Sequence, residues 1–187
     1  PRRQAVSPLR WDAVAATIFT DPQIATVGLS EQRAAKADIH VLTQTLPLSS
    51  NSRAKMSNLQ DGFVKLLARP GSGTIVGGAV VAGYASDLIA PISAACFNRL
   101  TASQLSQAFQ IYPSFAGSIQ ECARRLAVRV QDRLEEEAID DRGRHMVAGP
   151  AAWVAEQLND YLEAGADGFV YKAVSFDELK RVIDDVL

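Results

Sequence analysis

The sequence is poor in residues that hold metals or carry redox chemistry. Its 187 residues include two cysteines and two histidines. Cys96 and Cys122 are too far apart for the C-x-x-C spacing typical of a metal or redox site. His40 and His145 have no second ligand at a suitable spacing. We therefore expect two free, mostly buried thiols and no metal site.

Long apolar runs and a strong net charge are also missing. The longest apolar stretch, residues 75–82, is far shorter than the roughly 20 residues that a membrane span needs. No apolar segment of the kind found in signal peptides follows the first, basic residues. The net charge of -2 gives no electrostatic reason to expect nucleic acid as a partner. These absences predict a cytoplasmic protein with no membrane span and no nucleic-acid partner.

The glycines do not form a dinucleotide-binding fingerprint. Gly71, Gly73, Gly77 and Gly78 make no G-x-G-x-x-G motif between a strand and a helix. Their spacing instead fits a hairpin turn and close packing of the backbone. The isolated chain is therefore expected to bind no dinucleotide.

The pattern along the chain places strands before helices. Short β-rich runs predict strands at 14–19, 24–29 and 41–48, and a hairpin of 62–68 and 74–82 around the turn 69–73. Apolar spacing and caps predict helices at 31–37, 85–100 and 114–130, with a short helix capped by Thr101. This order favours an α+β domain, an antiparallel sheet with helices packed on one face.

Composition divides the chain into four parts. Residues 1–12 have the character of a linker or a truncated edge, and 13–130 contain the domain. Residues 131–146 are a charged boundary segment with almost no core-forming residues. Residues 147–187 predict a small α-β-α tail, with helices at 152–163 and 175–187 and a strand at 169–171.

Four motifs in order resemble one known family. They are residues 19–31 (FTDPQIATVGLSE), 62–66 (GFVKL), 75–81 (IVGGAVV) and 85–89 (ASDLI). Over about residues 13–127 the chain resembles the C-terminal dimerisation domain of FAD-dependent pyridine-nucleotide disulfide oxidoreductases. Residues 46–48, 51–56 and 111–114 look most like the lipoamide-dehydrogenase-like NAD(P)H:quinone reductases. The resemblance implies a homodimer, and a parent enzyme whose FAD and NAD(P) domains are supplied by missing upstream sequence.

The segment from Gln110 to Glu121 departs from the family pattern. In the disulfide reductases a histidine and, five residues later, a glutamate perform acid-base chemistry, but Tyr112 and Gly117 occupy those positions. We therefore expect no catalytic residue in this chain. The resemblance implies that Tyr112, Pro113 and Ser114 line an electron-acceptor site or the edge of the partner's flavin.

A packing role for the same segment is the alternative. Tyr112 and Phe115 would then serve only as contacts between subunits. The expected dimer interface consists of apolar and aromatic residues from the helix 85–100 and the segment 111–119: Leu88, Ile92, Tyr112, Phe115 and Ile119.

The tail has two partial resemblances. Residues 145–170 look like the end of a luciferase-like flavin monooxygenase barrel. Residues 164–187 instead resemble the last strand and helix of a response-regulator receiver, with Lys172 at the usual lysine and Ala173 where proline is common. Residues 142–146 resemble a cloning scar, which leaves an engineered or accidental fusion open. A non-catalytic homodimeric interaction protein is the competing function.

Overall fold

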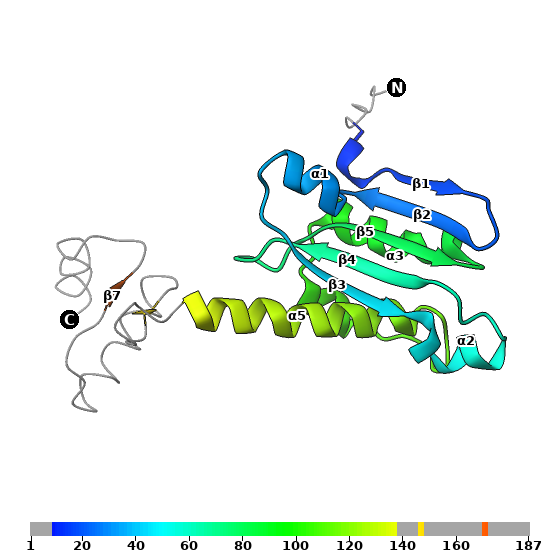
Figure 1. Ribbon diagram of the computed structural model, residues 1–187. Coiled ribbons are helices and arrows are strands. Elements are labelled where there is room, and N and C mark those ends of the chain that lie inside the picture. The colour runs from blue at the N-terminus through cyan, green and yellow to red at the C-terminus, as the bar shows by residue number, and fades with distance from the viewer. Residues whose placement is uncertain (1–8, 138–145, 148–169, 172–187) are drawn as a thin grey trace, which may run out of the picture. The chain divides into compact units, whose positions relative to one another are not determined.

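The computed structural model describes residues 9–137, 146–147 and 170–171 (Figure 1). The chain divides into two compact units, residues 1–131 and 132–187. In the second unit, two short strands, β6 (Met146–Val147) and β7 (Val170–Tyr171), pair in parallel. The tail helices expected at 152–163 and 175–187 lie outside the described residues.

The first unit contains a five-stranded antiparallel sheet. Its strands are β1 (Ala15–Ile18), β2 (Gln23–Gly28), β3 (Leu42–Pro47), β4 (Phe63–Ala68) and β5 (Ile75–Ala82). Their spatial order is β1-β2-β5-β4-β3, so the hairpin of β4 and β5 lies inside the sheet and β1 and β3 form its edges. The predicted α+β class is confirmed.

The turn between β4 and β5 follows from its glycines. Gly73 has a φ of +67°, a conformation that side chains disfavour. Its amide donates to the Arg69 carbonyl oxygen at 2.8 Å, and the Arg69 amide donates to the Thr74 carbonyl oxygen at 2.9 Å. The tight turn thus brings the two strands into register, as the sequence predicts.

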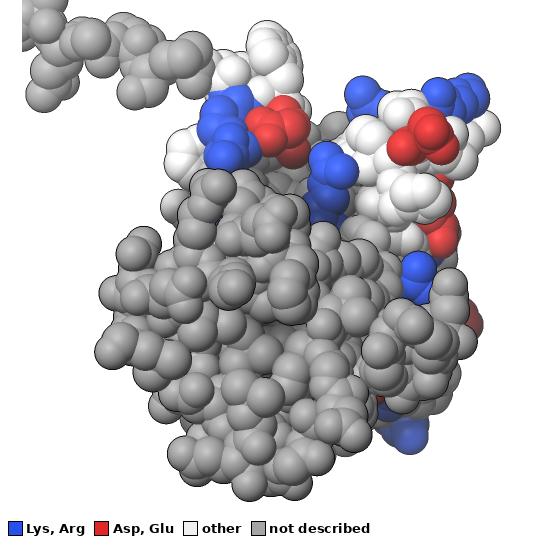
Figure 2. All heavy atoms as spheres, turned by 90° about the vertical axis from the view of Figure 1, so that its left-hand side faces the viewer, with Lys and Arg blue, Asp and Glu red and all other residues white. Residues whose placement is uncertain are grey.

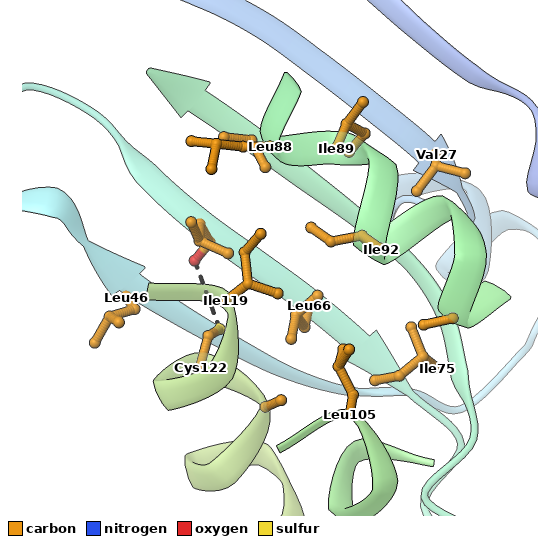
Figure 3. Packing of buried hydrophobic residues seen from close by; sticks show 14 of the residues in the cluster. Val27, Leu46, Leu66, Ile75, Leu88, Ile89, Ile92, Leu105, Ile119 and Cys122 are labelled. Carbon is orange, nitrogen blue, oxygen red and sulfur yellow. Dashed lines mark hydrogen bonds between the residues drawn. The ribbon is translucent and has the colours of Figure 1, made fainter. Parts of the chain in front are cut away.

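The longer helices are α3 (Ala85–Asn98) and α5 (Gly117–Glu137), and the short ones are α1 (Glu31–Lys36), α2 (Ser52–Met56) and α4 (Ala102–Gln107). Helices α3, α4 and α5 share a buried cluster with one face of this sheet, whereas Glu31 of α1 pairs with Lys65 on the other face. Two 3-10 turns, η1 (Trp11–Ala13) and η2 (Leu48–Ser50), flank the sheet. Figure 3 shows side chains of α3, α4 and α5 meeting those of the strands in one cluster.

Small residues on the sheet allow the helices to approach closely. A side chain at Gly78 would lie 2.8 Å from the Ile92 Cγ2 atom, so α3 packs directly over the backbone of β5. Ala25, Val80 and Val64 face one another across three strands and are fully buried. Each buried branched side chain contributes about 1.5–3 kcal/mol.

This close packing accounts for three of the residues expected at the dimer interface. Leu88, Ile92 and Ile119 are 8%, 0% and 3% exposed, and all three belong to the core cluster. They are committed to the domain's own core because the glycine and alanines of the sheet leave room for them. Phe115 is partly buried against the same core. Of the five expected interface residues, Tyr112 alone is largely exposed.

Two helical boundaries differ from the sequence prediction. The polar stretch 49–61, to which the sequence pattern assigns no element, contains α2 and part of η2. Asn51 caps α2, its Oδ1 accepting from the Ala54 amide at 3.0 Å. Helix α5 begins at Gly117 rather than at residue 114, and it continues beyond residue 130 to Glu137. The charged residues after 130 can extend a helix without adding to the core.

Candidate functional site

The segment that carries Tyr112 connects α4 to α5 at one end of the sheet. Tyr112 is 84% exposed and Ile111 is 77% exposed. The Tyr112–Pro113 peptide bond is cis. The hydroxyl groups of Tyr112 and Ser52 lie 3.1 Å apart, which joins the segment to α2.

Asn51 fixes the base of this segment. Its Nδ2 donates to the Ser114 carbonyl oxygen at 2.9 Å and to the Ser118 hydroxyl at 2.7 Å. Ser118 is the one buried polar residue in the described part of the chain, so its hydroxyl needs this partner. Because Asn51 also caps α2, one side chain joins the start of α2, the Tyr112 segment and the first turn of α5.

A hollow of about 440 Å³ opens beside these residues. Tyr112, Pro113 and Ser114, the three residues expected at an acceptor site, all line it. Asn51 and Ser52, which are not among the residues expected at the site, line it too. The remaining lining residues come from β3, η2, α4, the segment before Tyr112 and the first two turns of α5: Leu46, Ser50, Ser106, Gln110, Ile111, Gly117, Ser118, Gln120, Glu121 and Arg124.

The charged groups of the hollow offer no proton donor near neutral pH. Hydrogen bonds from Arg124, and then from Arg125, lower the pKa of Glu121 to about 2. The Arg124 Nε lies 2.8 Å from Glu121 Oε2, and the Arg125 Nε lies 2.7 Å from Oε1. Glu121 is therefore ionised near neutral pH, where its carboxylate can accept hydrogen bonds but has no proton to donate.

Gly117 stands where the family pattern has a glutamate. A side chain there would meet only the Ser114 Oγ, at 3.8 Å, so packing does not require glycine. The Gly117 amide donates to that same oxygen at 3.2 Å, which satisfies one of the free amides at the start of α5. The position has space for an acid but carries none.

Both cysteines are free and buried, as the sequence predicts. Burial raises the pKa of Cys96 to about 11 and that of Cys122 to about 12. The Cys122 Sγ also lies 3.3 Å from the Gln44 carbonyl oxygen. Both groups are thus neutral thiols near pH 7 and poor nucleophiles. In the described residues, no group of three potential metal ligands is present, and no helix is long and apolar enough to span a membrane.

Comparison with known families identifies the domain. Residues 14–123 match the model of the pyridine nucleotide-disulphide oxidoreductase dimerisation domain. The chain belongs to this family. The dimerisation domain accounts for the sheet, α3, α4 and the first turns of α5, and the resemblance inferred from the four motifs is confirmed.

Relatives of this dimerisation domain are considerably longer proteins. An NAD(P)H dehydrogenase (quinone) of Mycobacterium tuberculosis is 44% identical over 147 residues, which are 79% of this chain and 29% of the relative. A dihydrolipoyl dehydrogenase of Geobacillus stearothermophilus is 33% identical over 117 residues, 63% of this chain and 25% of the relative. The chain thus spans less than a third of either relative.

Solved structures agree with these relatives. The crystal structure of LpdA from Mycobacterium tuberculosis is 48% identical, with a TM-score of 0.63, over 66% of this chain and 27% of that one. The flavoprotein disulfide reductase RclA of Escherichia coli is 20% identical, with a TM-score of 0.58, over 60% of this chain and 26% of that one. At that identity RclA supports the fold alone.

Proposed function

We propose that this domain holds together two subunits of an FAD-dependent NAD(P)H oxidoreductase of the quinone-reductase kind. In the same proposal, the Tyr112 segment closes the acceptor site, or the flavin edge, of the neighbouring subunit. Membership of the dimerisation-domain family and similarity to an NAD(P)H dehydrogenase (quinone) support this function. A cytoplasmic location stays a prediction.

The observation that carries the proposal is an exposed apolar segment. Phe109, Ile111 and Tyr112 are 93%, 77% and 84% exposed, although they lie within four residues of one another. Large apolar side chains concentrated on the surface are typical of sites that another protein surface covers. Phe115 extends this patch inward, its ring 5.7 Å from that of Tyr84.

The chemistry available at the patch is recognition rather than catalysis. FAD and NAD(P)H, bound by other parts of the parent enzyme, would supply the hydride chemistry. The residues of this domain would exclude water and orient an acceptor. The Tyr112 hydroxyl, paired with that of Ser52, can donate a hydrogen bond to a carbonyl oxygen such as that of a quinone. Without the histidine and glutamate of the disulfide reductases, thiol acid-base chemistry has no donor here.

Sedimentation of the purified chain tests the dimerisation role. Ile111→Glu places a charge on each copy of the patch, while 77% exposure means that folding loses little. We expect at least about 100-fold weaker self-association, because burying an unpaired charge costs several kcal/mol. Ile18→Glu is the matched control, since Ile18 is 61% exposed on the edge strand β1, away from the patch.

Two results would contradict the proposal. One is an unmodified chain that stays monomeric at about 100 μM, a concentration that detects even weak dimers. The other is equal weakening by both substitutions. Either result means that the patch does not hold two copies of this domain together.

A further inference from the structure

A second hollow lies at the opposite end of the sheet from Tyr112. Arg10, Arg33, Arg69 and Arg99 line its walls, within a volume of about 630 Å³. They come from four separate segments: the start of η1, helix α1, the β4–β5 turn and the end of α3. Figure 2 shows basic side chains on the described surface at this end, with acidic side chains beside them. The length of β4, about 17 Å, separates this hollow from the Tyr112 site.

The arginines outnumber the acids that could neutralise them. Asp12 is the only acidic residue in the lining, and its Oδ2 lies 2.5 Å from the Arg10 Nη2. Arg10 is held further by the Phe97 carbonyl oxygen and by stacking over the Phe97 ring at 5.6 Å. Arg33, Arg69 and Arg99 form no salt bridge within residues 9–137. Three positive charges therefore face the hollow without a bonded carboxylate.

An aromatic surface completes the site. Trp11 lines the same hollow and is 79% exposed, although a tryptophan usually buries most of its ring. Guanidinium groups bind phosphate oxygens through paired hydrogen bonds, and an indole ring can stack on a nucleotide base. The hollow thus combines the two kinds of group that recognise a nucleotide through its charge and its base.

We propose that this hollow binds a nucleoside diphosphate or a closely similar nucleotide. Arg33, Arg69 and Arg99 would contact the phosphates, and the base would stack on Trp11. Arg10 would take part mainly by keeping Asp12 paired and away from the phosphates. The proposal does not depend on the function assigned to the Tyr112 segment, because the two sites share no lining residue.

Tryptophan fluorescence of the full chain tests the site. Trp153→Phe leaves Trp11 as the single tryptophan; ADP is titrated directly, and pyrophosphate is measured by its displacement of bound ADP. We expect saturable quenching by ADP with a dissociation constant below about 1 mM, and at least about fivefold weaker binding of pyrophosphate, because stacking of one base contributes about 1–3 kcal/mol. Added salt should weaken binding of both.

Charge-matched variants separate this site from a general attraction to basic surfaces. Arg69→Gln combined with Arg99→Gln removes two charges from the hollow, whereas Lys36→Gln combined with Arg53→Gln removes two charges outside it. The first pair should weaken ADP binding by at least about tenfold, and the second by less than about twofold.

Three outcomes would overturn the proposal. They are no saturable binding of ADP below about 1 mM, similar weakening by both variant pairs, and equal affinities for ADP and pyrophosphate. The last outcome would leave a phosphate site but remove the nucleotide from it. Displacement of bound ADP by pyrophosphate at higher concentration, with the expected ranking of variants, would support the site as described.

Discussion

Asn51 makes the contact on which the shape of the Tyr112 site depends. Its amide group forms three hydrogen bonds, to the Ser114 carbonyl oxygen, the Ser118 hydroxyl and the Ala54 amide. Asn51→Ala removes all three while changing little apolar area. The substitution therefore measures how strongly polar contacts hold the segment to the core.

The expected cost has two parts. Losing the cap of α2 costs about 1 kcal/mol. Leaving the Ser118 hydroxyl buried at 1% exposure without its partner costs about 1–3 kcal/mol more. We therefore expect Asn51→Ala to lower the free energy of unfolding by about 2–4 kcal/mol, a large share of the 5–15 kcal/mol typical of a domain.

Urea denaturation of a double-mutant cycle isolates the buried contact. Ser118→Ala removes the hydroxyl that Asn51 satisfies, so Asn51→Ala in that background leaves no orphaned group there. The double variant should lose less unfolding free energy than the two single variants lose together, by about 1 kcal/mol. Ser52→Ala is the control: its bond to Tyr112 is exposed, and we expect a change within about 0.5 kcal/mol.

Additive losses would refute this reasoning. If the two single losses sum to the double loss within about 0.5 kcal/mol, the hydroxyl is not coupled to Asn51. A loss below about 1 kcal/mol for Asn51→Ala would show further that water replaces the amide at no cost. The Tyr112 segment would then owe its position to packing alone.

Two further predictions concern buried groups. Gly77→Ala should destabilise the domain by several kcal/mol, because its Cβ would lie 2.1 Å from the Leu29 carbonyl oxygen. Gly71→Ala should be tolerated, since a Cβ there would meet nothing within 4 Å. The melting temperatures of the two variants, measured by thermal denaturation, test this difference. Cys96 and Cys122 should resist alkylation at pH 8 and react on unfolding. Burial raises the pKa values of these thiols to about 11 and about 12, so only the unfolded thiols ionise just above pH 9. The free energy of unfolding should therefore fall as the pH rises above about 9. Mass spectrometry tests the alkylation, and denaturation at several pH values tests the stability.

Local signals in the sequence predicted most of the sheet. The Gly73 turn, the alternation in β5 and the Ser30 cap of α1 each depend on neighbours along the chain. Ser30 Oγ accepts from the Arg33 amide at 3.2 Å, as a helix cap should. Elements fixed by such short-range chemistry can be identified without knowledge of the fold.

Contacts between distant residues were harder to predict. Leu88, Ile92 and Ile119 are apolar residues of the kind expected at a dimer interface, yet they lie in the core of the domain. For Ile92 this burial depends on Gly78 lying beneath it, a pairing of β5 with α3 that spacing along the chain does not show. Asn51 was missed for the same reason, since its partners Ser114 and Ser118 are more than 60 residues away.

The Asn51 contacts also bear on how the Tyr112 segment would meet a partner. An exposed apolar loop normally loses conformational freedom when it binds, and this loss opposes association. Here the second half of the segment is held before any partner arrives, mainly by Asn51 at Ser114 and more weakly by the exposed contact of Ser52 with Tyr112. The segment then loses less conformational entropy on binding, so more of the free energy gained by burying Phe109 and Ile111 is available for association. Asn51→Ala should consequently weaken self-association even though Asn51 itself need not touch the partner.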